Sequence, residues 1–204
     1  MNREKLREAE DRFLALYPLG FRDPAMLTLG KKHKMAQMIA LAQDSFAEEK
    51  FTDLLAVAEN LVKIVSRSSM VSIFEKPKFR EGVFTMDSQQ LQALANGLRG
   101  FLHGNQQEGF EKLVATLRPL KLAKWSLLTV APNYYRPIDE VFVKPTTVKG
   151  VIDHFELAGL TYSPQPTWAF YAAYRQAIQE MKALVAPSLS PSNAAFGGFL
   201  MMSI

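Results

Sequence analysis

The chain has 204 residues, of which 48% are hydrophobic and 22% are charged, and its formal net charge at pH 7 is +4. This composition is typical of a globular protein that buries a real core, and the absence of cysteine excludes disulfide bonds, thiolate metal sites and cysteine nucleophiles. The N-terminal residues are too charged for a signal peptide, and no apolar run reaches the ~20 residues of a membrane span. We therefore expect a cytoplasmic protein with no membrane partner.

The first part of the chain predicts helices that are separated by proline and glycine. A helix is expected at residues 3–16, with Asn2 as its N-cap. The sequence Tyr-Pro-Leu-Gly that follows should end it. Pro24 suits the first turn of the next helix, whose apolar residues continue to Phe46, and Gly30 is the point where this helix can be interrupted.

The cleanest amphipathic pattern in the chain lies at residues 49–65. Its apolar residues recur every three or four positions, so Leu55 and Leu61 are both expected in the core. The character then changes, because serine and β-branched residues precede a charged segment with the composition of a turn. This change predicts a two-stranded β-ribbon around residues 76–82, which would have to pack on helices.

A helical hairpin is predicted at residues 88–103 and 106–117. Asp87 or Ser88 is expected to cap the first helix, and Gly104 is expected to end it. Because only a few residues join the two helices, they should pack against each other in antiparallel orientation.

Three further elements are expected in the last part of the chain. A short helix should cover residues 146–157, and a long helix should run from Thr167 to about Val185. Residues 194–204 are apolar and predict a buried terminal helix or strand.

The complete pattern predicts a mainly α, multi-helix domain with a minor β-ribbon. No internal repeat is present, and no linker is long enough to separate domains. We therefore expect a single domain over residues 1–204, in which residues 1–118 form a helical half and residues 119–204 form a half rich in proline and aromatic residues.

Residues 119–175 are the most distinctive stretch, because they contain both tryptophans and five of the six tyrosines. Within residues 119–150, five basic residues are opposed by two acidic residues, which leaves this segment with a net charge of +3. Basic residues interspersed with aromatic residues are typical of a surface that contacts phosphates and stacks on bases. The nucleic-acid-binding residues predicted on this basis are Lys121, Lys124, Tyr134, Tyr135, Arg136, Lys144 and Lys149.

Two other functions are compatible with the same stretch. Its lysines can be part of a solvated loop over a core tryptophan, in a protein that serves as a protein–protein interaction module or a homo-oligomer. An enzyme would need a site assembled around Arg136, Lys144 and Tyr162. The three histidines lack the spacing of metal ligands, and the glycine-rich phosphate-binding motifs and the G-x-S-x-G motif are absent. No catalytic residue, metal ion or cofactor is therefore predicted.

A second cationic cluster is the sequence Gly-Lys-Lys-His-Lys at residues 30–34. Its lysines have the chemistry to contact phosphate. If they lie within a helix, however, they form its solvated face, and this is the interpretation that we favour.

Several short motifs in residues 120–204 resemble a pattern found in an uncharacterised bacterial family. The motifs are Lys124-Trp125-x-Leu127-x-Thr129, Val143-Lys144-Pro145-Thr146, Tyr162-x-Pro164-x-Pro166-x-Trp168-x-x-Tyr171 and Phe196-x-x-Phe199. Related segments in that family occur as stand-alone proteins and beside modification-dependent restriction ATPases. The resemblance implies an accessory role in a defence system and identifies no catalytic residue.

Overall fold

The computed structural model describes all 204 residues and contains eleven α-helices, three short 3-10 helices and no β-strand. The expectation of a mainly α protein is confirmed. The α-helices are α1 (Arg3–Leu16), α2 (Pro24–Lys32), α3 (Met35–Ser45), α4 (Leu54–Arg67), α5 (Glu75–Phe84), α6 (Ser88–His103), α7 (Gln106–Leu117), α8 (Trp125–Tyr135), α9 (Pro145–His154), α10 (Trp168–Lys182) and α11 (Asn193–Met202). The 3-10 helices are Gly20–Arg22, Glu48–Thr52 and Pro187–Leu189.

The predicted β-ribbon around residues 76–82 is wrong, because this segment forms helix α5. Pro77 is in the first turn of α5, where a proline removes no helical hydrogen bond. Phe79 and Val83 are one turn apart and both are buried, so they fix this helix on the core. The β-branched and serine residues before it form the connection from α4, not a strand.

The long amphipathic pattern of residues 24–46 divides into two helices, but the break is not at Gly30. Helix α2 ends at Lys32, and Lys34 has the left-handed backbone angle φ of 53° before α3 begins. The predicted helix 49–65 also begins later than expected. Glu48–Thr52 is a separate 3-10 helix, and the Asp53 side chain accepts a hydrogen bond from the Ala56 amide to cap α4.

The buried face of α4 includes Leu61 but not Leu55. Leu61 is 3% exposed, whereas Leu55 is 54% exposed. Leu55 lies on the same exposed side of α4 as Glu59 and Lys63, whereas Leu54 in the same turn packs against the core. The expectation that Leu55 lies in the core was therefore wrong.

We expect Leu61→Ala to lower the free energy of unfolding by ~2–5 kcal/mol, the usual cost of truncating a buried leucine. The matched change Leu55→Ala, on the same helix, should alter it by less than about 0.5 kcal/mol, because that side chain is exposed. Urea unfolding of the two variants measures the difference. Equal losses in the free energy of unfolding for Leu61→Ala and Leu55→Ala would show that the burial pattern of α4 is incorrect.

The predicted hairpin is confirmed as helices α6 and α7. Asp87, rather than Ser88, is the N-cap of α6. Its carboxylate accepts a hydrogen bond from the Gln90 amide at 2.9 Å, and the Gln90 side chain accepts one from the Asp87 amide at 3.0 Å. These reciprocal bonds form a capping box that satisfies two amides at the helix start.

Asp87→Ala should therefore cost ~1 kcal/mol of stability, the typical effect of losing an N-cap. Ser88→Ala should be close to neutral, because Ser88 is the first residue of the helix and not its cap. Thermal unfolding of both variants tests this assignment. A larger loss for Ser88→Ala than for Asp87→Ala would reverse it.

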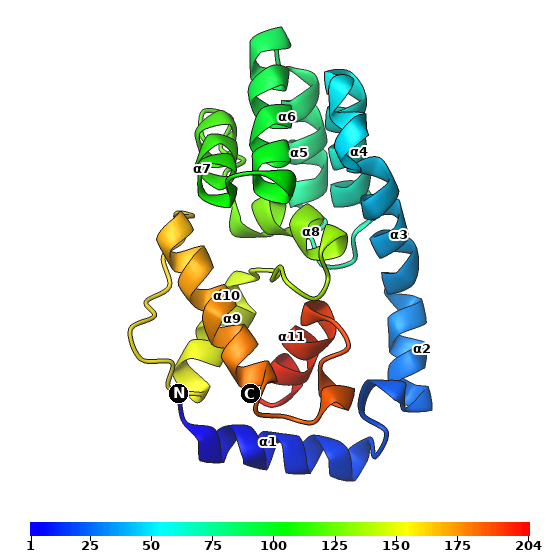
Figure 1. The fold of residues 1–204 in the computed structure, drawn as a ribbon, viewed down its shortest axis with the longest axis vertical. Helices are drawn as coiled ribbons and strands as arrows, with labels where there is room; N and C mark the ends of the chain where they lie inside the picture. Colours follow the sequence, from blue (N-terminus) through cyan, green and yellow to red (C-terminus); the bar gives the residue numbers. More distant parts are fainter.

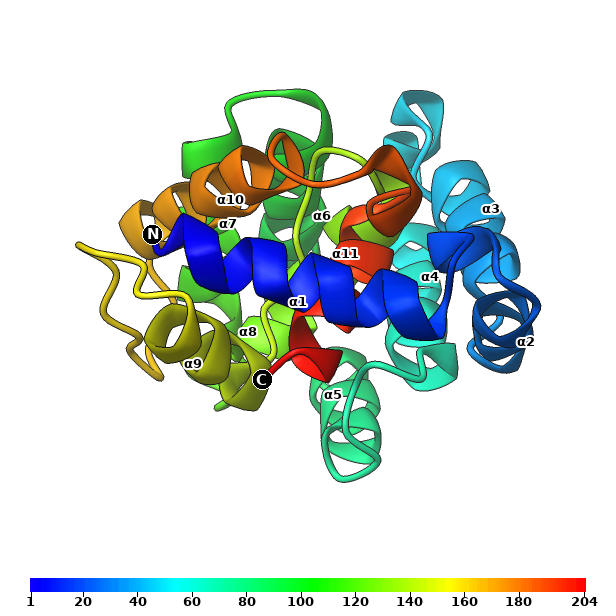
Figure 2. The same cartoon turned by 90° about the horizontal axis from the view of Figure 1, so that it is seen from below.

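Figure 1 shows how the helices are arranged. Helices α4 to α7 lie side by side at one end of the molecule, and α8 lies beneath them. Helices α9, α10 and α11 form the other half, and α1 runs across the far end, as Figure 2 also shows. A single cluster of 50 buried hydrophobic residues extends from Leu6 to Leu200 and so involves both halves.

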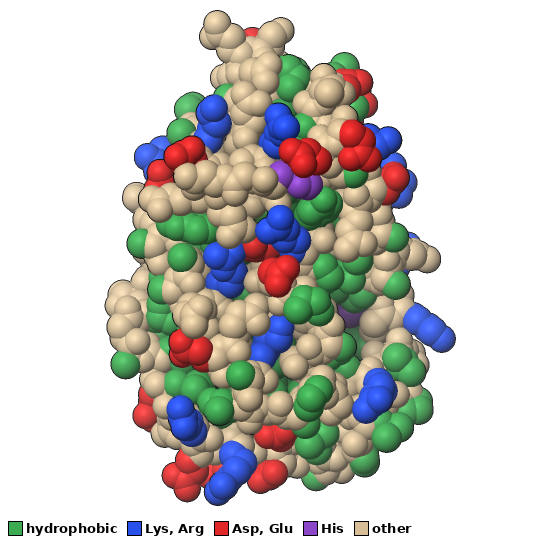
Figure 3. Space-filling view, viewed as in Figure 1, with side chains coloured by type: hydrophobic (Ala, Val, Ile, Leu, Met, Phe, Trp, Pro, Cys, Tyr) green, Lys and Arg blue, Asp and Glu red, His purple; other side chains and the backbone are tan.

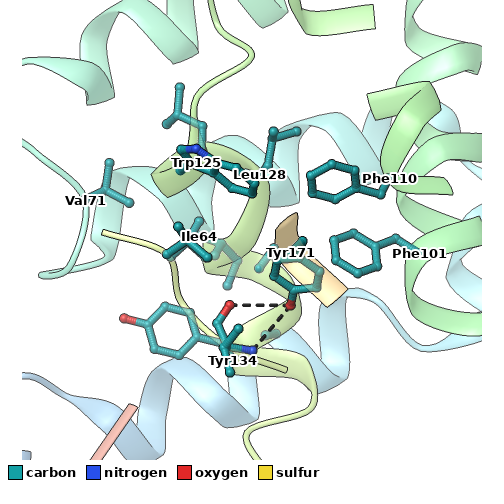
Figure 4. Close-up of a cluster of buried hydrophobic side chains, with 14 of the residues drawn as sticks. Ile64, Val71, Phe101, Phe110, Trp125, Leu128, Tyr134 and Tyr171 are labelled. Carbon is teal, nitrogen blue, oxygen red and sulfur yellow. Dashed lines mark hydrogen bonds between the residues drawn. The ribbon is translucent and has the colours of Figure 1, made fainter. Parts of the chain in front are cut away.

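Helix α8 is the centre of this arrangement, because ten of its residues, Trp125 to Tyr134, are buried. The Trp125 indole donates a hydrogen bond to the Ser163 carbonyl at 2.7 Å, which ties α8 to the segment before α10. The rings of Phe101, Phe110 and Tyr171 pack against one another with centroids 5.5 to 5.6 Å apart, beside α8 in the core (Figure 4). Most of the aromatic residues that made residues 119–175 distinctive are therefore structural.

Candidate functional site: a basic hollow beside helix α3

The tyrosines predicted to bind nucleic acid have unequal access to solvent. Tyr134 is 0% exposed, and its hydroxyl lies 3.0 Å from the Ser68 hydroxyl. Burial raises the pKa of the Tyr134 phenol. Its ring is part of the core and has no free face on which a base could stack. Tyr135 is partly buried, with its ring edge against His103.

The basic residues predicted in the same stretch lie at both ends of α8. Lys121 and Lys124 precede its first turn, and Arg136 follows its last residue. A helix of this length spans roughly 16 Å, so these charges do not form one compact site. Lys144 is exposed at the start of α9, and the Lys149 ammonium lies 5.0 Å from the Tyr162 ring centroid.

The structure brings no reactive cluster together from these residues. The Lys124 ammonium is 3.6 Å from the Glu75 carboxylate, which also accepts a hydrogen bond from Ser126. No hydrogen bond or ion pair joins Arg136, Lys144 and Tyr162, the residues considered for an enzyme site. The enzyme site considered around these three residues stays a prediction.

The most extensive buried polar cluster is centred on Glu140, which is 1% exposed. One nitrogen of Arg175 donates to both of its carboxylate oxygens, at 2.8 and 2.9 Å. The Tyr171 hydroxyl donates to one oxygen at 2.6 Å, and the Gln106 amide donates to the other at 2.7 Å. The pKa of Tyr171 is raised well above its usual value by burial and then by the Glu140 carboxylate, which keeps this donor protonated.

The same cluster holds the segment between α8 and α9 against the rest of the protein. The side-chain amide of Asn193 donates a hydrogen bond to the Glu140 carbonyl at 2.9 Å. The backbone amide of Val141 donates one to the Tyr171 hydroxyl, where Figure 4 draws dashed lines. Sequence patterns assign no special role to Glu140, because its partners lie far away along the chain. Both oxygens of its carboxylate accept hydrogen bonds, so the cluster links α7, α10 and the segment between α8 and α9.

A different surface combines exposure with unpaired charge. Residues 24–43 contain three lysines and no acidic residue, and residues 60–74 contain Lys63 and Arg67 and no acidic residue. These five positive charges exceed the net +4 of the whole chain. Figure 3 shows the molecule in the view of Figure 1, and over most of this face basic and acidic side chains are interspersed.

The fold brings these two segments together. Helices α3 and α4 pack against each other, and the His33 ring nitrogen Nδ1 is 2.8 Å from the Ser69 hydroxyl. Beside these helices is a hollow of about 570 Å³, which we call the basic hollow. It is lined by Lys34, Gln37, Met38, Leu41 and Arg67.

The cations of this surface are free to bind an external anion. The four ion pairs of the protein use other residues, so neither Lys34 nor Arg67 has an acidic partner. No side chain caps the first turn of α3, whose amides add partial positive charge beside Lys34. Within the cluster at residues 30–34, Lys31 and Lys32 are exposed in the last turn of α2, as expected for a solvated helix face, whereas Lys34 lies outside that helix, immediately before α3.

Comparison of the chain with protein-family models, with curated proteins and with solved structures gives no significant match. None of its helices has both the length and the apolar character that are needed to cross a membrane. No group of three or more histidine, aspartate or glutamate side chains is placed to hold a metal ion. The basic hollow is the surface feature whose chemistry points most clearly to a partner.

Proposed function

We propose that this protein binds nucleic acid without catalysing a reaction on it, and that phosphates contact the basic hollow and the lysines around it. The observation that carries this proposal is the convergence of two acid-free segments, which contribute five lysine and arginine residues to one region. Contacts between such residues and phosphates supply much of the affinity of nucleic-acid-binding proteins.

The pairing state of these cations supports the proposal. An arginine or lysine that is already paired must lose that partner before it can bind phosphate, and neither Lys34 nor Arg67 has one. The Arg67 guanidinium can donate two parallel hydrogen bonds to one phosphate. Lys63 lies one turn before Arg67 on α4 and extends the same charged surface.

The exposed lysines of residues 119–150 remain part of the proposal as a secondary contact. Lys121, Lys144 and Lys149 are exposed and have no acidic partner. A long ligand would contact such charges in addition to the basic hollow. The accessory role in defence implied by the resemblance of residues 120–204 agrees with a nucleic-acid partner and stays a prediction.

The experiment is a titration of labelled oligonucleotides with the full-length protein at two salt concentrations. Binding should weaken steeply as salt increases. Changing Lys34 and Arg67 together to alanine should lower affinity about ten-fold or more and flatten the slope of log K against log salt by about one unit for each lost phosphate contact. The effect should be similar for all sequences, because phosphate contacts carry no sequence information.

The matched control changes the same residue types elsewhere. Arg3 on α1 and Lys112 on α7 are exposed and have no acidic partner. Changing both to alanine removes the same two positive charges as the hollow variant, at positions that do not line the hollow. A third variant, Lys144→Ala with Lys149→Ala, measures the secondary contact. Absence of binding at micromolar protein in low salt, or equal losses for the hollow variant and the Arg3/Lys112 control, would refute the proposal.

A further inference from the structure

We infer that the nucleic acid bound at this surface is single-stranded, with unpaired bases taken up by the apolar part of the basic hollow and by Phe74. This inference rests on the function proposed above and specifies the ligand of the same site. It is carried by two observations, the mixed lining of the hollow and an exposed aromatic residue at the same end of helix α4.

The lining of the hollow combines the two chemistries of a nucleotide. Lys34 and Arg67 supply positive charge for phosphate, while the half-buried Leu41 supplies apolar surface next to Met38, which is buried. The Gln37 amide has both a donor and an acceptor for the edge of a base. In a duplex the faces of the bases are stacked and their pairing edges are occupied, so only an unpaired base can use this apolar surface and this amide together.

The shape of the hollow also favours a single strand. Its volume of about 570 Å³ is within the range of ~300–1,000 Å³ that is usual for pockets that enclose small molecules. Proteins read duplex DNA mainly by inserting a helix or a β-ribbon into the major groove. The surfaces of α3 and α4 instead form a concavity at this position, which a base from a flexible strand can enter.

Phe74 provides the second observation. It is 76% exposed, and Ile73 beside it is 71% exposed, although large apolar side chains of this size are normally covered. Residues 68–74 connect the end of α4, where Arg67 lies, to the start of α5, which packs on α4. Phe74 is therefore at the same end of this helix pair as the basic hollow.

The connection that carries Phe74 is held in place by hydrogen bonds. The Met70 amide donates to the Ser68 hydroxyl at 3.1 Å, and the Phe74 amide donates to the Ser72 hydroxyl at 3.3 Å. His33 contacts Ser69 in the same segment. An exposed aromatic ring on an ordered connection that begins at Arg67 is the kind of group on which proteins stack single-stranded bases.

The test compares a single-stranded oligonucleotide with the duplex of the same sequence, at one salt concentration and with both DNA and RNA. The single strand should bind at least ten-fold more tightly. Phe74→Ala should reduce single-strand affinity about ten-fold and duplex affinity much less. The matched control is Phe84→Ala, because Phe84 is 59% exposed at the opposite end of α5 and should leave binding unchanged.

The outcomes separate this inference from the function on which it rests. Equal affinity for single strand and duplex, or a Phe74→Ala variant that behaves like Phe84→Ala, would overturn the inference and leave the proposed function standing. No binding of either ligand by the unchanged protein would remove both. Thermal unfolding of the two phenylalanine variants checks that both are folded, which is expected because both side chains are exposed.

Discussion

Gly109→Ala is expected to destabilise the protein by more than about 3 kcal/mol, or to prevent it from folding. Helices α6 and α7 cross so closely at this point that an added Cβ atom would collide with the Phe101 amide nitrogen and the Gly100 carbonyl carbon, and would lie 2.7 Å from the Gly97 carbonyl oxygen. All three are backbone atoms, so no side chain can rotate away. The hairpin would have to separate, which would expose the apolar faces that its two helices bury.

Gly30→Ala is the matched control for this prediction. Gly30 also lies within a helix, α2. An alanine Cβ at this position would have no atom within 4 Å other than those of the neighbouring residues and backbone of the same helix. Alanine has a higher helix propensity than glycine, so this change should be neutral or stabilise the protein by up to ~1 kcal/mol. Urea unfolding of both variants gives the comparison. Gly109→Ala with a stability close to that of the parent would contradict the close crossing of α6 and α7.

Arg175→Ala is expected to cost ~3–5 kcal/mol, because it leaves the buried Glu140 carboxylate without its positive partner. The substitution also removes the guanidinium from its position 5.5 Å from the ring centroids of Trp168 and Tyr171. The matched change Glu180→Ala, on the same helix, should have little effect, because that side chain is exposed and has no basic partner.

A second substitution separates charge from packing. In the Arg175→Ala background, Glu140→Gln removes the unpaired charge while keeping most of the volume of the side chain. The double variant should therefore be more stable than Arg175→Ala alone. Equilibrium unfolding of the single and double variants measures this coupling. If Glu140→Gln caused a further loss, the unpaired charge would not be the main cost of Arg175→Ala, and the hydrogen bonds that Gln106 and Tyr171 donate to Glu140 would matter more.

Much of the secondary structure could be predicted because its signals are local. Asn2, Asp87 and Thr167 each supply a side-chain oxygen that accepts a hydrogen bond from an amide in the first turn of the helix that follows. Such caps, together with apolar residues at helical spacing, are formed by residues within a few positions of one another. Helices α1, α6, α7 and α10 were therefore located within a few residues of their observed bounds.

The incorrect expectations concern segments in which local preference does not decide the outcome. The β-branched and serine-rich sequence before Glu75 favours a strand, but residues 75–84 form helix α5, which packs Phe79 and Val83 on the core. Leu55 has the spacing of a core residue and is nevertheless exposed, because it lies on the side of α4 that faces solvent, with Glu59 and Lys63. Periodicity identifies an apolar face, whereas only packing decides how much of that face is covered.

The amino-acid sequence alone establishes that the chain is helical, that it has no cysteine chemistry and that its charge is unevenly distributed. Which of these charges are available to a ligand depends on how the helices pack. The fold pairs Lys124 with Glu75, buries Tyr134 in the core, and brings Arg67 of α4 to the same hollow as Lys34. Caps and periodicity can be read from the chain because they depend on neighbours along it, whereas ion pairing, burial and the convergence of charge depend on distances through space.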